Sequence, residues 1–166
     1  AGQGYVHLYI NGLYWGLYHT IERPNASFFA THLGGTKEEY DVVQHKGGTV
    51  DGNRDAWNAM MGIANAGVQS PEAYEAIQQY VDIENLIDYM ILNFYMGNYD
   101  WDGHNWIAAR QRSEDGRFRF FAWDSEFAIA LPPGNTAVGE NAENQIINVN
   151  RTGISSNNKP SRIHQQ

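Results

Sequence analysis

The sequence predicts an α+β fold, with a β-rich first part over residues 1–53 and a helical second part over residues 54–131. Three observations support this prediction. An Asn-Gly pair joins two β-rich runs near the start, apolar residues recur at helical spacing through the middle, and two further β-rich runs then flank a short polar turn. The length of 166 residues suits one domain with a real core and is too short for two large ones.

The β-rich part should begin with a hairpin. Residues 5–10 and 13–21 are rich in β-branched and aromatic side chains. Asn11-Gly12, between these runs, is the strongest short sequence pattern for a tight hairpin turn. We therefore expect an antiparallel pair of strands at the start of the chain.

One short helix and one strand should follow the hairpin. A helix is expected over residues 26–33, because the Gly-Gly pair at 34–35 is a typical helix end. Residues 40–45 predict a short strand. The stretch 47–53 is rich in Gly, Asp and Asn and is expected to be a loop.

Three helices are predicted in the second part. Residues 54–66 place large apolar side chains at helical spacing. The Ser-Pro-Glu sequence at 70–72 is a typical helix start, and this helix should run to about Tyr80. Asp82 should cap the most apolar helix, which should end at Gly97. Apolar residues cover more than one face of this last helix, so a central position is expected.

A second hairpin should follow, formed by residues 105–112 and 117–123 around a turn at 113–116. After Leu131 the chain is rich in Asn, Gly and Ser with little periodicity. Residues 132–166 are therefore expected to be extended and poorly structured, as if the chain stopped before its domain does.

Charge and composition exclude several functional classes. The net charge of −8 argues against nucleic acid as the main partner and against binding to an anionic membrane surface, but it suits divalent cations. The chain has no cysteine, which excludes disulfides and cysteine zinc sites. It has no apolar run of 18 residues, so no membrane span is predicted.

An acidic loop between the long helix and the second hairpin is the candidate site. Asp100 is followed after four residues by Asn105, and Asp124 comes directly after the hairpin. Kinases use this order of helix, acidic loop, hairpin and acid for their catalytic loop and metal-binding residues. Phosphoryl transfer needs a carboxylate near the acceptor hydroxyl, and amide and carboxylate oxygens that bind hard cations. The alternative is a solvated acidic turn in which Asp100 or Asp102 caps the backbone.

Several sequence segments resemble a known family. They are residues 9–18 with Glu22, residues 40–43 leading to Lys46 and Gly47, residues 84–89, residues 98–102 with Asn105 and Trp106, and residues 123–127. Two patterns among them are quite specific, Asn-Gly-x-Tyr-Trp-Gly and Asp-Trp-x-x-x-Asn. Together these segments resemble the CotH kinase family, secreted or spore-surface proteins with a divergent protein-kinase-like fold.

The resemblance implies an activity and a location. Asp100 would be the acid of the catalytic loop, and Asn105 and Asp124 would be metal ligands. The reaction would use ATP with magnesium or manganese, and would transfer the γ-phosphoryl group to a protein hydroxyl of Ser or Thr, with Ser expected. The protein would be extracellular or at the cell or spore surface. The family domain is longer than this chain at both ends, so a truncated domain is expected.

Two further acids and one tryptophan lie close to the predicted metal site. Asp102 and Glu126 could assist the cation, although Asp102 could equally belong to a solvated turn. Glu126 could also face the other side of an extended segment. Trp101 lies inside the acidic loop and could stack on a ligand, whereas most tryptophans belong to the core.

Two candidates in the first part concern the nucleotide. Lys46 follows a strand and precedes two glycines, so it could contact a phosphate, or it could be a solvated strand-end lysine. Glu22 could orient a lysine as a kinase glutamate does. A surface ion pair of Glu22 with Arg23 or Arg54 is the alternative.

Two rival functions remain open. The chain could be an extracellular binding or adhesion module that keeps the fold without turnover and binds carbohydrate or calcium. It could also be a glycoside hydrolase that uses two of four carboxylates as acid and nucleophile. Those four are Asp100, Asp102, Asp124 and Glu126.

Overall fold

The computed structural model of the chain describes residues 4–45, 48–96, 98, 101 and 104–125. These residues form helices and two antiparallel sheets, one with two strands and one with four. The mixed composition agrees with the predicted α+β class. The predicted extended segment 132–166 lies outside the described residues.

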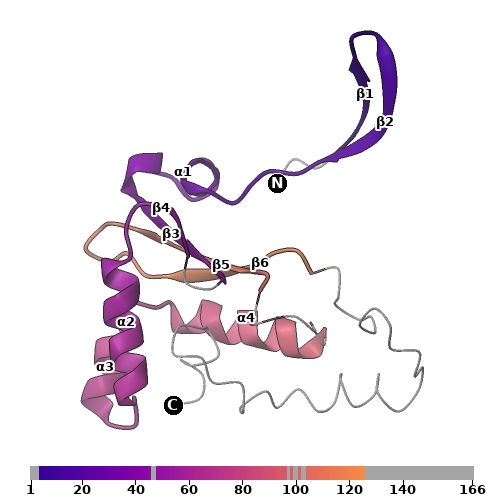
Figure 1. Cartoon of the computed structure of the whole chain (residues 1–166). Coiled ribbons are helices and arrows are strands. Elements are labelled where there is room, and N and C mark those ends of the chain that lie inside the picture. The colour runs from indigo at the N-terminus through magenta and orange to yellow at the C-terminus, as the bar shows by residue number, and fades with distance from the viewer. Residues whose placement is uncertain (1–3, 46–47, 97, 99–100, 102–103, 126–166) are drawn as a thin grey trace, which may run out of the picture.

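The first hairpin is formed as predicted and projects away from the rest of the molecule (Figure 1). Strands β1 (Gly4–Ile10) and β2 (Leu13–Thr20) pair antiparallel. Both turn residues have positive φ, 51° at Asn11 and 80° at Gly12. That conformation matches the right-handed twist of paired strands, which is why Asn-Gly is favoured there. Large apolar side chains of this hairpin, such as Trp15, remain exposed.

Helix α1 (Ala26–Leu33) follows with the predicted bounds. The side chain of Asn25 caps its first turn, because Oδ1 accepts a hydrogen bond from the backbone N–H of Phe28 at 3.0 Å. The N–H of Ala26 donates to Oδ2 of Asp51 at 2.9 Å. The helix start is therefore tied to a residue 25 positions later.

The four-stranded sheet has the order β4-β3-β5-β6. A short 3₁₀ turn, η1 (Lys37–Glu39), leads into β3 (Tyr40–Gln44), which pairs with β4 (Gly48–Asp51). The second predicted hairpin is confirmed as β5 (Trp106–Gln111) and β6 (Arg119–Ala122). Pairing of β3 with β5 joins the β-rich first part to the second part in one sheet.

The expectation of a loop over residues 47–53 is wrong for β4. Its sequence, Gly-Thr-Val-Asp, has only two residues that favour strands, between a glycine and an aspartate that are depleted there, so its local preference is weak. The backbone nevertheless pairs with β3, which already has a partner on its other side, and Asp51 at the end of β4 caps α1. Tertiary pairing therefore overrides the local preference.

The three predicted helices are α2 (Asp55–Ala66), α3 (Pro71–Gln78) and α4 (Ile83–Tyr95). Ser70 and Asp82 cap α3 and α4 through their side-chain oxygens, as predicted. The expected helix end at Gly97 lies outside the described residues, and Met96 is the C-cap. Helix α4 lies along the sheet at β6 (Figure 1). Two hydrogen bonds join them, from Phe120 N–H to Asn85 Oδ1 at 2.6 Å and from Asn85 Nδ2 to Phe120 O at 3.3 Å.

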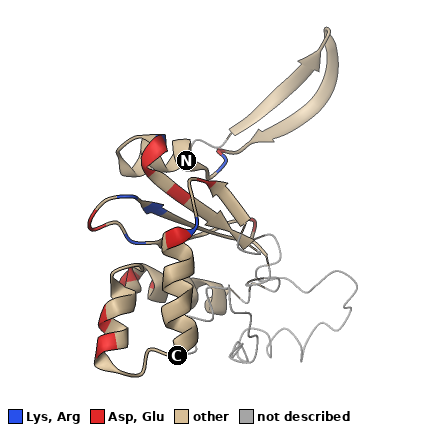
Figure 2. Ribbon diagram, turned by 60° about the vertical axis from the view of Figure 1, so that its left-hand side comes forward, with Lys and Arg blue, Asp and Glu red and all other residues tan. Residues whose placement is uncertain are grey.

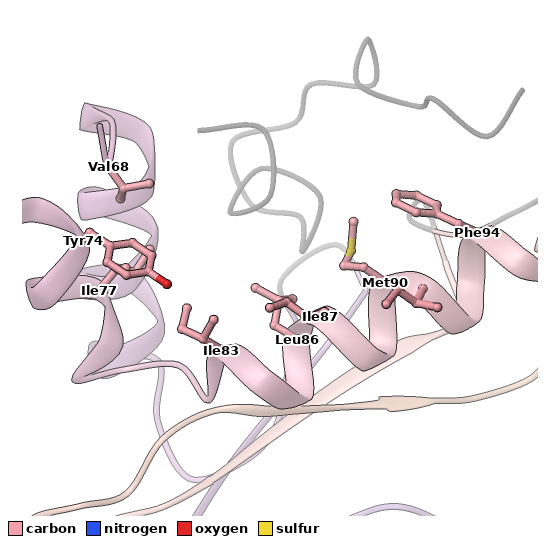
Figure 3. A pocket seen from close by; sticks show the side chains of 9 residues that line it. Val68, Tyr74, Ile77, Ile83, Leu86, Ile87, Met90 and Phe94 are labelled. Atoms are coloured by element: carbon pink, nitrogen blue, oxygen red, sulfur yellow. The ribbon is translucent and has the colours of Figure 1, made fainter. Parts of the chain in front are cut away.

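Helix α4 is less central than its apolar sequence predicts. It buries Leu86, Tyr89, Met90 and Asn93 against the main core. Leu86 and Met90 also border an apolar groove of about 360 Å³, which the exposed Ile87 and Ile91 line together with α3 and Val68 (Figure 3). Within the described residues no helix is both long and apolar enough to cross a membrane.

Charge is unevenly distributed over these elements (Figure 2). Arg54 is the one cation in residues 54–96, whereas acidic residues recur along α3 and α4. Arginines concentrate on the β5–β6 hairpin. Arg112 Nη1 there donates to Oδ1 of the buried Asp41 at 2.6 Å, and so ties β3 to the end of β5.

Glu39 is a second acid in this region, and we expect it to make folding sensitive to acid. Its Oε2 accepts from Thr36 N–H at 3.1 Å and from Gln111 Nε2 at 2.9 Å. These bonds, and the nearby Arg112, lower the pKa of Glu39. A lowered folded-state pKa stabilises the protein above the unfolded value, roughly 4.3 for Glu, and this stabilisation is lost as pH falls through the folded value.

Titration of the Glu39 carboxyl carbon by NMR should give a midpoint below the ordinary glutamate value. Glu39→Gln should lower the melting temperature at neutral pH. The difference in melting temperature between neutral pH and pH 3 should also be smaller in this variant than in the wild type. A midpoint at or above the ordinary value would contradict this account.

Candidate functional site

Asn105 and Asp124 lie side by side at the open end of the β5–β6 hairpin. Nδ2 of Asn105 donates a hydrogen bond to the backbone carbonyl of Asp124 at 2.7 Å. The two residues immediately precede β5 and closely follow β6, so pairing of the strands brings them together across 19 positions of sequence. Asn105 is largely buried and Asp124 is exposed. Two residues that the sequence predicted to belong to one site are therefore neighbours, joined through the backbone carbonyl of Asp124.

Both residues also have an unusual backbone conformation. The φ angle is 59° at Asn105 and 53° at Asp124. Residues other than glycine rarely adopt this left-handed region, although Asn and Asp tolerate it best. Such conformations cost free energy and cluster at functional sites, where the surrounding structure holds them. Asn105 and Asp124 are thus close to each other, and both have a left-handed backbone conformation.

A pocket of about 320 Å³ opens beside this pair. Trp106 and Trp123, the sequence neighbours of Asn105 and Asp124, contribute to its wall. The remaining lining comes from residues after β2 and from β3, β4 and β5: Ile21, Arg23, Pro24, Gln44, Val50 and Ile107. Arg23 also lines this pocket, a role that the sequence did not suggest. A pocket with a mixed polar and apolar lining that includes one arginine suits a ligand that has both an apolar part and an anionic part.

The acidic loop is anchored to α4 by its described residues, Asn98 and Trp101. Trp101 is buried, and its Nε1 donates to the hydroxyl of Tyr89 at 2.6 Å. Its ring packs edge-on against Tyr89 and Phe94. The hypothesis that Trp101 stacks on a ligand is therefore wrong, because the side chain belongs to the core.

Four predicted site residues lie outside the described residues: Lys46, Asp100, Asp102 and Glu126. Their roles stay predictions. Asp124 is the one carboxylate of the proposed glycosidase set that the structure describes, so that hypothesis also stays untested. Among the described residues no group of three or more His, Cys, Asp or Glu side chains could hold a metal ion.

Glu22 lies after β2, and its Oε2 is 3.3 Å from Nε2 of His32 on α1. Both side chains are partly exposed. The expected role of Glu22 in orienting a lysine stays a prediction. The contact with His32 was not predicted from the sequence.

The structure also brings together two histidines that showed no ligand spacing in the sequence. The rings of His45, after β3, and His104, before β5, have centroids 5.5 Å apart. They are near neighbours because β3 and β5 are paired strands. Only this pairing, and no local pattern, could have revealed the contact.

Comparison with known proteins agrees with the resemblance seen in the sequence. The family model described as CotH kinase protein matches residues 3–158, which is most of the chain. No curated protein and no solved structure matches it. The chain belongs to the CotH kinase family.

Proposed function

We propose that this protein is a phosphotransferase that uses ATP and a divalent cation, magnesium or manganese, to phosphorylate a protein hydroxyl, with Ser expected as the acceptor. We also propose that it has a divergent kinase-like fold and acts outside the cell or at the cell or spore surface. The observation that carries the proposal is the hydrogen bond of 2.7 Å from Asn105 Nδ2 to the backbone carbonyl of Asp124. Family membership supports phosphoryl transfer as the reaction class.

The side chains present fit a hard divalent cation. Magnesium prefers oxygen ligands, and Asn105 and Asp124 offer an amide oxygen and a carboxylate. The Nδ2 group of Asn105 is occupied by its hydrogen bond to the carbonyl of Asp124, which orients the amide. Asp124 is exposed, so its carboxylate is accessible to an ion with several bound waters. A bound cation would supply neutralisation of phosphate charge at this place.

The chain's own residues would bind and orient the reactants. The pocket lined by Trp106 and Trp123 would accept the nucleotide, and Arg23 would face its anionic part. Asp100, by family resemblance, would accept the proton from the acceptor hydroxyl. Holding the reactants in one geometry is the main contribution that a protein can make to phosphoryl transfer.

Nucleotide binding is the first test. MgATP at about 100 times its Kd should stabilise the folded chain by about 2.7 kcal/mol, because a ligand that binds only the folded state shifts unfolding by mass action. Thermal melting with MgATP, with ATP plus EDTA, and with magnesium alone would measure this. The proposal expects a shift that needs both components, together with transfer of labelled γ-phosphate to a protein acceptor. Identical melting curves under all three conditions would refute it.

A binding module for carbohydrate is the second candidate, and the first hairpin favours it. Its aromatic side chains, including Tyr5, Tyr9 and Trp15, are exposed. Exposed aromatic rings offer apolar faces on which sugars can stack. If this candidate is right, an oligosaccharide panel will stabilise the chain and MgATP will not.

A further inference from the structure

The apolar groove between α3 and α4 is open to solvent, although large apolar side chains line it. Its volume is about 360 Å³, and Tyr74 contributes the one hydroxyl group of the lining. The side chains of Tyr74, Ile87 and Ile91 are 45%, 52% and 59% exposed. Contiguous exposed apolar surface marks interaction sites, whereas single exposed apolar residues are ordinary. The groove is therefore a candidate docking surface for another protein.

The shape of the groove suits a helix. The lining residues on α4 recur from Ile83 to Phe94 at the spacing that places residues on one face of a helix. Ile83 and Phe94 lie about 16 Å apart along the helix axis, at a rise of about 1.5 Å per residue. At the end near Ile83, Tyr74 and Ile77 of α3 close the groove (Figure 3). An amphipathic helix of about three turns has apolar residues at the matching spacing.

The solvent side of the groove is acidic. Glu84 and Asp88 are exposed on α4. Glu84 lies three residues before Ile87, and Asp88 lies three residues before Ile91. Residues three apart are neighbours on a helix surface, so both carboxylates flank the exposed isoleucines. Neither carboxylate makes an ion pair within the part of the chain that the structure describes.

The neighbouring residues do not neutralise this charge. Residues 67–96 contain no Lys, Arg or His, and their acids are Glu72, Glu75, Asp82, Glu84 and Asp88. Of these, Asp82 is paired with Arg119, with 3.6 Å between Oδ2 and Nε. A second copy of this chain is a poor occupant, because its net charge is also −8 and like charges across an interface cost free energy.

We infer that the groove binds an amphipathic helix of a partner protein, one that carries Lys or Arg beside its apolar face. The apolar face of this helix would cover Ile87 and Ile91, and its cations would meet Glu84 and Asp88. The inference goes beyond the proposed phosphotransferase function and does not depend on it. It concerns a surface that α3 and α4 form, whereas the proposed nucleotide pocket is lined by other residues.

Two synthetic peptides of about 18 residues, roughly five helical turns, test the inference. Both carry Leu at helical spacing, and they differ in having Lys or Glu beside this apolar face. Fluorescence anisotropy with the whole chain and no nucleotide would measure binding, so the result is separate from any test of phosphate transfer. We expect the Lys peptide to bind, and the Glu peptide to bind at least about tenfold more weakly. Added salt should weaken binding of the Lys peptide.

Two variants of the groove should change this binding. Ile91→Gln should weaken binding of the Lys peptide about tenfold or more, because it removes an apolar contact. Asp88→Lys should weaken it on the order of fivefold and should strengthen binding of the Glu peptide. Both positions are exposed, so the melting temperatures should stay close to the wild-type value.

Leu92→Gln is the matched control. Leu92 lies on the same helix and is 42% exposed, but it does not line the groove. This variant should bind the Lys peptide as tightly as the wild type. Equal losses of binding in Ile91→Gln and Leu92→Gln, equal affinity for the two peptides, or no binding of the Lys peptide would each overturn the inference. A dimer in sedimentation experiments that Ile91→Gln dissociates would also overturn it, because the occupant would then be a second copy.

Discussion

Asp124→Asn should reduce kcat for phosphate transfer on the order of 10²- to 10³-fold, the loss typical of removing one group that stabilises developing charge. The substitution removes the negative charge and keeps the size of the side chain. Asn also tolerates the left-handed φ of 53° at this position, so the backbone should not rearrange. The stability of the fold should change little because Asp124 is exposed.

The same charge change at the other end of the hairpin provides the control. Asp115 is exposed in the turn between β5 and β6. Asp115→Asn should leave kcat and the melting temperature close to those of the wild type. Steady-state kinetics over a range of magnesium concentrations would measure both variants. Full activity of Asp124→Asn at all magnesium concentrations would remove this residue from the proposed metal site.

Trp57→Ala should destabilise the protein by about 3–5 kcal/mol, the usual cost of truncating a large buried aromatic side chain. Trp57 is fully buried at the centre of the main core. Its ring stacks on Trp106 with centroids 5.3 Å apart and meets Phe118 edge-on at 5.3 Å. Urea denaturation would measure the loss as a lower midpoint with a similar slope.

The effect should reach the candidate site as well as the core. Trp106 lines the pocket, and it is the first residue of β5 and directly follows Asn105. Loss of the ring that supports it should weaken MgATP binding in addition to lowering stability. Trp15→Ala is the control, since Trp15 lies on the projecting hairpin and is 59% exposed. The free energy of unfolding of the Trp15→Ala variant should stay within about 0.5 kcal/mol of the wild-type value, as for most surface substitutions. Equal midpoints for the two variants would contradict the assignment of Trp57 to the core.

Local sequence patterns predicted most of the secondary structure. The Asn-Gly turn at 11–12 and the capping side chains Ser70 and Asp82 act within a few residues of their own positions. Their conformational preferences therefore survive in the folded chain almost unchanged. The order of helix, acidic loop and hairpin is also a pattern of neighbouring segments. It predicted Asn105 and Asp124 as members of one site.

Interactions between distant segments were not predictable from such patterns. The strand β4 has a weak local preference for strand and is formed through its pairing with β3. The burial of Trp101 depends on Tyr89 and Phe94 of α4, and the approach of His45 to His104 depends on the pairing of β3 with β5. Each of these features requires knowing which segments meet.

The sequence by itself determined the class of fold, the turns and caps of its elements and the family, and it predicted Asn105 and Asp124 as metal ligands. These features follow from short-range conformational preferences and from motif spacing, both of which are present in the linear chain. Only the tertiary structure decided that Asn105 Nδ2 and the carbonyl of Asp124 lie 2.7 Å apart, and that Arg23 joins two tryptophans in the adjacent pocket. Contacts of this kind depend on strand register and on packing of the whole core, which no single segment encodes.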